Sequence, residues 1–305
     1  MEIVTDITQL NWENTAITIG KFDGVHTGHQ MLVDKVLTAG NEGCIPVVFT
    51  FDRLPAQLLQ QRTVVKNIFT EQEKQEYLSM CGIQRYIIFP FSKETAAMEP
   101  EQFILEILVK QLQVKKLYVG EDFRFGKGRK GDAVLLEKLS SQYGFSFEAV
   151  EKKLYLGEEV SSTRIRDSIY LGRMEEVSDM LGRPFYLGGK IIHGRSLGHT
   201  IGVPTINQSI QEGKIIPKTG VYCSQVTIEG KVYHGITNVG SKPTVQEEII
   251  YGAETHLFDC DSNLYGKYAK TELLHFVREE QKFASIDELM QQMNQDIMLG
   301  RKYFS

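Results

Sequence analysis

The sequence predicts an α/β domain built on a parallel sheet, followed by a smaller domain made mostly of antiparallel strands. In the first part of the chain, short β-branched apolar runs alternate with segments of helical apolar spacing. Beyond residue 183 the pattern changes to alternating strands separated by glycine turns, with a single helix at the end. We therefore expect one domain over residues 1–183 and a second over residues 184–305.

Composition excludes several classes of function. A chain of 305 residues can bury two separate cores. A net charge of −5 argues against nucleic-acid binding by bulk electrostatics. The four cysteines are scattered without metal-ligand spacing, and we expect neither a leader segment nor a membrane-spanning segment. We expect a cytoplasmic protein that acts on small molecules, with no nucleic acid, membrane or obligatory protein partner.

The elements of the first domain follow from periodicity. Strands are predicted at residues 16–19, 45–51, 86–89, 117–119 and 145–150, all short and rich in apolar residues. Helices are predicted at residues 30–37, 71–80, 100–112, 133–143 and 169–180, with Pro100 and Asp132 as start signals. Strictly alternating strands and helices predict a doubly wound parallel sheet, which binds ligands at the carboxyl ends of its strands.

The second domain has the pattern of a small antiparallel barrel. Strands are predicted at residues 188–192, 220–228, 231–238, 254–260 and 271–277. Glu229-Gly230 fits a two-residue hairpin turn between the second and third of these strands. Ser285 and Glu288 have the spacing of a capping box, which predicts that the final helix begins there.

The most informative motif directly follows the first predicted strand. Gly20, Phe22, Asp23, Gly24, His26, Gly28 and His29 form the pattern Gly-x-Phe-Asp-Gly-x-His-x-Gly-His. Glycines at a strand-to-helix turn let backbone N–H groups approach a ligand, and a helix N-terminus favours an anion. Two imidazoles at the same turn can donate hydrogen bonds to phosphate oxygens. A solvated βα turn is the alternative, but paired histidines at this spacing favour a phosphate site.

Two further segments favour phosphate binding. Asp122, Phe123, Arg124 and Phe125 begin a glycine-rich basic loop after the fourth strand, where a ligand of the sheet would lie. Ser162, Thr163 and Arg166 open a helix, so that hydroxyl, backbone N–H and guanidinium groups can face one anion. Either segment could instead be an ordinary surface loop or an ordinary helix cap.

Together these motifs resemble those of prokaryotic FAD synthetases, the bifunctional riboflavin kinase/FMN adenylyltransferase family. The resemblance implies a Rossmann-like N-terminal domain of the nucleotidylyltransferase type. It implies that His26 and His29 are catalytic in adenylyl transfer and that the remaining residues of the first motif bind ATP, together with Ser162, Thr163 and Arg166. It also implies that the loop from Asp122 to Phe125 contacts the flavin or the nucleotide.

The second half of the chain carries the riboflavin kinase motifs of the same family. Its residues read Gly-Val-Pro-Thr-Ile-Asn at 202–207 and Ala-Glu-Thr-His-Leu-Phe-Asp at 253–259. The resemblance implies that Thr205 and Asn207 hold Mg²⁺ and phosphate, that Glu254 is the catalytic base, and that Arg278 contacts the flavin. The expected activity is phosphorylation of riboflavin by ATP to FMN, followed by adenylylation of FMN by a second ATP to FAD.

Two departures from the family pattern keep alternatives open. Ile206 stands where the family usually has alanine, which raises the possibility of an FAD synthetase with a degenerate kinase domain. Arg53-Leu54-Pro55 replaces a Pro-His-Pro, and we expect Arg53 either to replace the histidine's phosphate contact or to point to solvent. A flavin-binding regulatory or storage protein is the alternative outside the enzymes.

Overall fold

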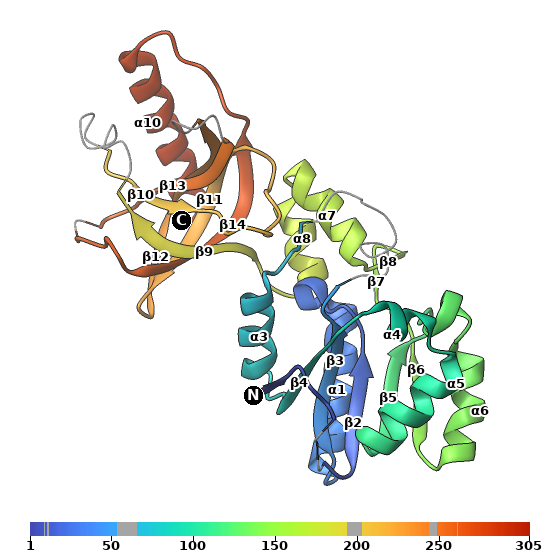
Figure 1. Ribbon diagram of the computed structural model, residues 1–305. Helices are drawn as coiled ribbons and strands as arrows, with labels where there is room; N and C mark the ends of the chain where they lie inside the picture. Colours follow the sequence, from blue (N-terminus) through green and yellow to red (C-terminus); the bar gives the residue numbers. More distant parts are fainter. Residues whose placement is uncertain (9, 11, 54–65, 194–202, 244–248, 261) are drawn as a thin grey trace. The chain divides into compact units, whose positions relative to one another are not determined.

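The computed structural model describes residues 1–305 except 9, 11, 54–65, 194–202, 244–248 and 261 (Figure 1). The chain divides into two compact units. The first comprises Met1–Val65 and Phe69–Ser161, and the second comprises Lys66–Ile68 and Ser162–Ser305. The helices after Ser161 therefore group with the C-terminal unit by their contacts. The predicted domain boundary lies between residues 183 and 184, and it stays a prediction.

Within the described residues, the first unit contains a sheet of six parallel strands in the order β1-β4-β3-β2-β5-β6 (Figure 1). The order reverses between β2 and β5, so the predicted switch point lies at the carboxyl ends of these two strands. The five predicted strands are confirmed, and β1 is an addition at the sheet edge. The strands are β1 (Glu2–Val4), β2 (Thr15–Ile19), β3 (Ile45–Phe51), β4 (Arg85–Phe89), β5 (Val114–Gly120) and β6 (Ser146–Val150).

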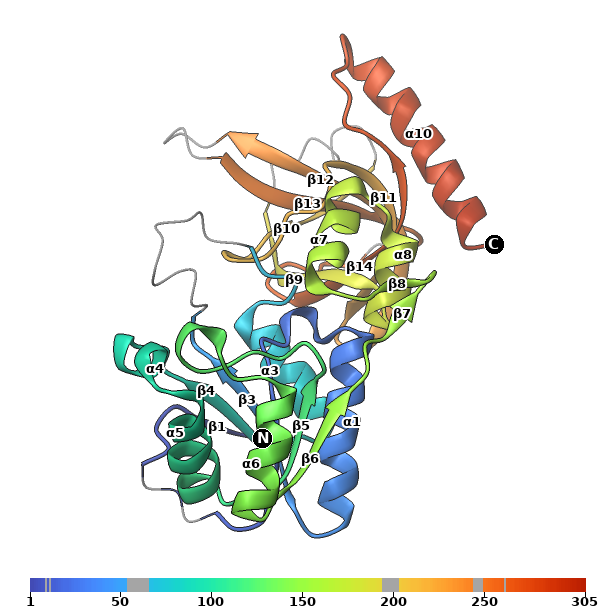
Figure 2. The ribbon, with the colours of Figure 1, turned by 90° about the vertical axis from the view of Figure 1, so that its right-hand side faces the viewer.

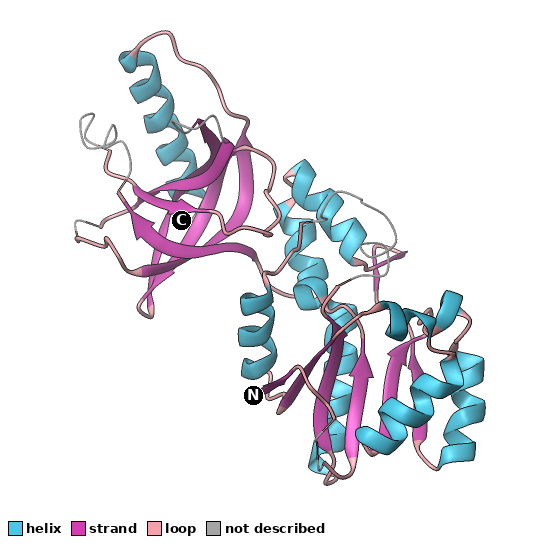
Figure 3. Ribbon diagram, in the orientation of Figure 1, coloured by secondary structure: helices cyan, strands magenta, loops and turns pink. Residues whose placement is uncertain are grey.

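Helices cover both faces of this sheet, which confirms the doubly wound architecture (Figure 3). Ile17 and Ile19 of β2 point to one face, where they pack with Leu108 and Leu136 from the helices there. The other face is covered by α1, which packs against β2, β3 and β5. The main helices are α1 (Thr27–Asn41), α3 (Glu71–Met80), α5 (Pro100–Gln102) with its π-helical continuation η2 (Phe103–Gln111), and α6 (Ala133–Tyr143).

Several short elements connect these layers. The helix α4 (Lys93–Ala97) follows β4, and single 3₁₀ turns occur at η1 (Asp23–Val25) and η3 (Lys127–Arg129). A small hairpin is formed by β7 (Leu154–Tyr155) and β8 (Glu158–Glu159). None of these was predicted, because segments of two to five residues are too short for apolar periodicity to reveal them.

In the second unit, six described antiparallel strands close into a barrel in the order β10-β13-β12-β11-β14-β9. The predicted barrel is confirmed, and β10 is an addition that lies between β9 and β13. Glu229 and Gly230 have φ angles of 49° and 82°, as the predicted hairpin turn requires. The strands are β9 (Phe185–Ile192), β10 (Ile206–Ser209), β11 (Gly220–Ile228), β12 (Lys231–Pro243), β13 (Ile249–Leu257) and β14 (Tyr268–Arg278).

Three helices complete the second unit: α7 (Ser162–Leu171), α8 (Met174–Leu181) and α10 (Ile286–Tyr303). The last of them packs on the outer face of the barrel against β11 and β12 (Figure 2). A Cβ atom on Gly300 would lie only 2.5 Å from the Ile236 side chain, so this glycine permits the close approach. The Ser285 hydroxyl caps the helix by accepting from the Glu288 N–H.

The predicted capping box at this helix is wrong in its second half. The Glu288 carboxylate accepts from the Ala284 N–H at 2.9 Å instead of reaching back to Ser285.

Among the residues that the structure describes, no helix combines the length and apolar character required to cross a bilayer.

Candidate active sites

The first motif forms a tight turn between β2 and α1. Phe22 and Gly24 both have positive φ angles, of 52° and 74°, and the chain then enters α1 with His26 as the N-cap residue. A phenylalanine rarely adopts this left-handed conformation, and strained backbone of this kind concentrates at functional sites. The turn thus brings both predicted catalytic histidines to the N-terminus of α1, where an anion is favoured.

The two histidines stack on each other. Their ring centroids are 3.7 Å apart, with an angle of 23° between the ring planes. The Nδ1 atom of His26 accepts a hydrogen bond from the His29 N–H at 3.4 Å. Neutral His26 must therefore carry its proton on Nε2, because Nδ1 is occupied as an acceptor. The Nε2–H of His26 is therefore a hydrogen-bond donor in this tautomer.

His29 is held in its neutral form. Burial lowers the pKa of His29 well below its usual value, and electrostatic interaction with the neighbouring His26 and Lys74 lowers the pKa further. Its buried Nδ1 atom has no hydrogen-bond partner within the described part of the chain. Buried polar atoms usually have a hydrogen-bond partner in native proteins, so this ring nitrogen suits a polar ligand at the turn.

The other residues of the motif shape the turn. Phe22 is fully buried, and its ring centroid lies 5.0 Å from that of His29. Asp23 is 2% exposed and accepts a hydrogen bond from the Phe69 N–H at 3.3 Å. A Cβ atom on Gly28 would lie 3.3 Å from the His26 ring, so a larger residue would crowd the histidine pair. Direct contacts of these residues with ATP stay predictions.

A cavity of about 470 Å³ opens at the carboxyl edge of the parallel sheet. Gly20 after β2 and Thr50 at the end of β3 contribute to its wall. The four predicted loop residues after β5, Asp122 to Phe125, also line it. The rings of Phe123 and Phe125 are stacked with centroids 5.5 Å apart. Aromatic rings beside basic side chains suit a planar ligand that carries phosphate.

Arg53 also lines this cavity, and its contact with phosphate stays a prediction. Its Nε atom donates to Asp52 Oδ2 at 3.2 Å, and Asp52 Oδ1 accepts from the Phe91 N–H at 2.8 Å. The side chain is 55% exposed, so the guanidinium is held at the cavity mouth rather than buried. Leu54 and Pro55 lie outside the described residues.

Ser162, Thr163 and Arg166 lie in the first two turns of α7, as the helix-start prediction required. Arg166 Nε donates to the backbone oxygen of Lys66 at 3.2 Å. These residues belong to the second compact unit, whereas His26 and His29 belong to the first. Their assignment to phosphate binding stays a prediction.

The barrel aligns polar residues in a single row across neighbouring strands. Glu254 on β13 is paired in register with Asn207 on β10 and with Asn238 on β12. Residues paired in this way point to the same face of a sheet. Asn238 lies two residues from Ile236, which packs in a cluster together with Ile297 of α10. The row therefore faces outward, toward the terminal helix.

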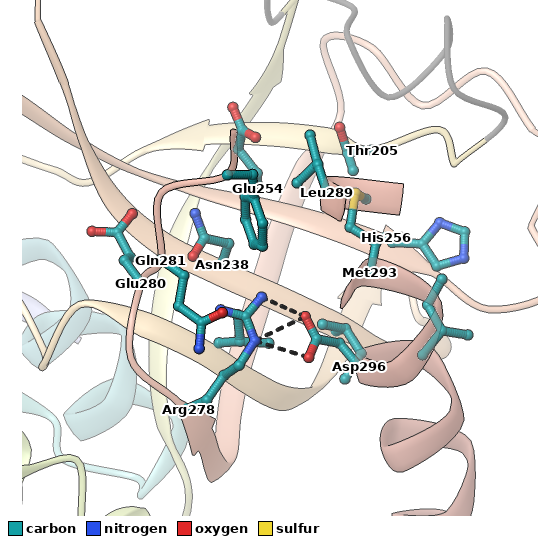
Figure 4. A pocket seen from close by; sticks show the side chains of 14 residues that line it. Thr205, Asn238, Glu254, His256, Arg278, Glu280, Gln281, Leu289, Met293 and Asp296 are labelled. Atoms are coloured by element: carbon teal, nitrogen blue, oxygen red, sulfur yellow. Dashed lines mark hydrogen bonds and ion pairs between the residues drawn. The ribbon is translucent and has the colours of Figure 1, made fainter. Parts of the chain in front are cut away.

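A pocket of about 340 Å³ lies between this outer face and α10 (Figure 4). Figure 4 shows Glu254 and Thr205 on one side of it and the Arg278–Asp296 pair on the other. A second cavity, of about 410 Å³, lies against the barrel. Thr205 lines both cavities. Two ligands bound in the two cavities would therefore meet at Thr205, close to the row that contains Glu254.

Arg278 lines the first of these cavities, but its guanidinium is largely engaged within the protein. Its Nε atom donates to Asp296 Oδ1 at 2.9 Å and its Nη2 atom donates to Asp296 Oδ2 at 2.6 Å. Its Nη1 atom donates to the backbone oxygen of Glu279 at 2.9 Å. The flavin contact of Arg278 stays a prediction. In the structure its bonds to Asp296 link β14 to α10.

Sequence reasoning missed three pocket residues: Asn238, His256 and Asp296. Asp296 had a detectable signal, because it is a carboxylate on the apolar face of an amphipathic helix, three residues after Met293. Asn238 and His256 lie in stretches that resemble the family, but they were given no role, since a polar residue in a strand is usually on a solvated face. Their importance depends on the strands beside them.

Two family models match successive parts of the chain. A family model described as FAD synthetase matches residues 8–164, and one described as riboflavin kinase matches residues 181–304. The crystal structure of a macrolide-efflux protein from Streptococcus pneumoniae superimposes with a TM-score of 0.86. It has 26% sequence identity, and the match covers 98% of both chains.

Curated relatives extend over nearly the whole chain. The bifunctional riboflavin kinase/FMN adenylyltransferase of Escherichia coli K12 is 36% identical over 303 residues, which is 99% of this chain and 96% of the relative. The protein of the same name from Haemophilus influenzae is 32% identical over 295 residues, which is 96% of this chain and 95% of that protein. The chain therefore belongs to the bifunctional riboflavin kinase/FMN adenylyltransferase family.

Proposed function

We propose that this chain phosphorylates riboflavin to FMN with one ATP and adenylylates FMN to FAD with a second ATP. The observation that carries the kinase assignment is the position of Glu254. It lies in a row of polar residues beside a cavity, and that cavity meets a second one at Thr205. Two adjoining cavities suit two substrates that exchange a phosphoryl group, and a storage protein for one ligand would not need them.

In the kinase reaction, riboflavin occupies the cavity under α10 and ATP occupies the second cavity. Glu254 accepts the proton of the riboflavin 5′-hydroxyl as its oxygen attacks the γ-phosphorus of ATP, and ADP leaves. A neutral hydroxyl is a weak nucleophile, so a positioned carboxylate increases the rate about 10²–10⁴-fold. Thr205, at the meeting point of the cavities, places its hydroxyl beside the phosphoryl group in transfer.

The residues present fit a magnesium ion. Thr205 and Asn207 offer hydroxyl and amide oxygens, the hard ligands that Mg²⁺ prefers, and Mg²⁺ usually takes its remaining ligands from water and substrate phosphates. The ion would neutralise negative charge on the phosphates.

In the adenylyl transfer, the FMN phosphate attacks the α-phosphorus of ATP and pyrophosphate leaves. This phosphate is already ionised at neutral pH, because its second pKa is about 6, so the reaction needs no base. Neutral His26 has an Nε2–H donor, and the N-terminus of α1 adds a positive field beside it. Catalysis here is positioning and charge stabilisation by these groups. The aromatic cavity around Phe123 would bind the flavin ring.

The structure weakens the case for a degenerate kinase. Ile206 prompted that alternative because a larger side chain could overpack the loop. It instead packs, partly buried, against the apolar cluster of the barrel that includes Ile191 and Leu257. Its position in β10, opposite Thr255, also keeps Asn207 paired with Glu254. The four free cysteines suit a reducing compartment, and we propose a cytoplasmic location with small molecules as the only obligatory partners.

Product analysis tests this proposal. The protein is incubated with ATP, Mg²⁺ and either riboflavin or FMN, and the flavins are separated by chromatography. We expect FMN and FAD from riboflavin, and FAD from FMN. Glu254→Gln should lose FMN formation but still convert FMN to FAD, and His26→Ala should show the reverse. If FAD forms from FMN but no FMN or FAD forms from riboflavin, the result would support the degenerate kinase. The absence of both products in both incubations would support a storage protein.

A further inference from the structure

One pocket residue has a contact that the proposed reactions do not use. His256 lies two residues after Glu254 on β13, and its Nδ1 atom is 3.0 Å from the backbone oxygen of Pro204. A carbonyl oxygen can only accept a hydrogen bond, so the ring nitrogen must be the donor. Nδ1 of His256 therefore carries a proton, whether the imidazole is neutral or charged.

The hydrogen bond from His256 to Pro204 lies just beyond the end of the pairing between β10 and β13. The ladder between β10 and β13 runs from Ser209 opposite Gly252 to Ile206 opposite Thr255. Pro204 and Thr205 lie just beyond its end. The oxygen of Pro204 and the nitrogen of Thr205 belong to one planar peptide group. Holding that oxygen therefore fixes the direction in which the chain and the Thr205 side chain leave the peptide.

We propose that His256 is a positioning residue of the kinase site, which holds the peptide before Thr205 so that Thr205 stays at the junction of the two cavities. The inference rests on the proposed role of Thr205 in phosphoryl transfer. Without the bond from His256, the described residues before β10 lose this link to β13, and Thr205 moves relative to Glu254. A displacement of about 1 Å in a catalytic group can lower a rate about 10²-fold.

A positioning role differs measurably from an acid–base role. The neutral ring protonated at Nδ1 and the imidazolium both present the Nδ1–H donor, so a positioning residue neither gives up nor takes a proton during the reaction. A group that transfers a proton would instead add its own pKa to the pH–rate profile. The ¹⁵N chemical shifts of the His256 ring give a direct readout, and we expect the Nδ1-protonated form throughout.

Three substitutions at one position separate these roles. His256→Leu keeps the approximate volume and removes the donor, and we expect kcat for riboflavin phosphorylation to fall about 10²-fold with little change in KM for riboflavin. His256→Asn places an amide N–H where Nδ1 was and should recover at least about tenfold of that loss. His256→Gln carries its amide one bond further out and should not recover it.

Each result decides the inference. Urea unfolding followed by hydrogen exchange of barrel amides shows that a variant barrel is folded, and FAD formation from supplied FMN shows that the second reaction is intact. A parental kcat in His256→Leu, an equal loss in the asparagine and leucine variants, or an Nε2-protonated neutral ring would overturn the proposal. Thr205→Ala, made in the unaltered background, tests the proposed function separately. If it leaves kcat unchanged, the role of Thr205 is wrong, whatever the His256 variants show.

Discussion

The ion pair between Arg278 and Asp296 allows a quantitative prediction about the docking of α10. The side chains are 18% and 4% exposed, respectively, and Gln292 adds a hydrogen bond to Asp296 at 3.0 Å. Asp296→Asn removes the negative charge and leaves the guanidinium without its counter-charge. Breaking a buried pair costs about 3–5 kcal/mol, and the partial exposure of Arg278 places this case near 3 kcal/mol. The substitution should therefore loosen α10 and the pocket beneath it.

Urea unfolding measures the effect. With a slope of about 2 kcal/mol per M, a loss of about 3 kcal/mol lowers the midpoint of the barrel transition by about 1.5 M. Hydrogen exchange of barrel amides reports that transition. Trp12, the single tryptophan, packs against the core of the first unit, and its fluorescence should not shift. KM for riboflavin should rise, because α10 forms one wall of the pocket.

Asp259→Asn is the matched control, because Asp259 makes a similar two-pronged pair with Arg301 on the same helix. That pair is largely exposed, with side-chain exposures of 77% and 51%, so its removal should change the midpoint little. Equal shifts in the two variants, or no shift in Asp296→Asn, would refute the reasoning from burial.

Three further predictions concern the two reactions. Glu254→Gln should lower the kinase rate about 10²–10⁴-fold without changing the urea midpoint of the barrel transition. A parental rate in steady-state assays would contradict the role of Glu254 as the base. Burial lowers the pKa of His29 in the folded state, whereas in the unfolded state this histidine gains a proton near pH 6.5. Below that pH the unfolded state therefore binds more protons than the folded state. The first unit should therefore lose stability as pH falls through that value, measured by Trp12 fluorescence in urea, and His29→Asn should reduce this dependence. Arg53→Ala should raise KM for FMN or ATP about tenfold or more in the second reaction only, and unchanged constants would mean that Arg53 contacts solvent alone.

Local patterns were sufficient to predict the architecture. Alternating strand and helix periodicities predicted the doubly wound sheet, and strands joined by glycine turns predicted the barrel, because burial imposes those periods on the chain. The His26–His29 turn was equally readable, since its glycines, histidines and helix start lie within ten residues of one another. The elements that were missed, such as β1 and β10, have three and four residues, too few to show a period.

Only the tertiary structure could assemble the kinase site. Asn207, Asn238 and Glu254 come from three strands, and the strand register alone places them in one row. The sequence identified two of these residues by resemblance but could not show that they face α10. The partner of Arg278 was likewise hidden, because Asp296 lies 18 residues away on a different element.

The sequence by itself determined which chemical groups each half of the chain carries, through motifs that are continuous along the backbone. The tertiary structure decided how those groups are held: a histidine kept neutral by burial, an arginine engaged by a helix carboxylate, and a threonine placed by a ring N–H from the neighbouring strand. The physical reason is that burial, charge pairing and strand register depend on residues brought together by folding, and adjacency in sequence does not report them.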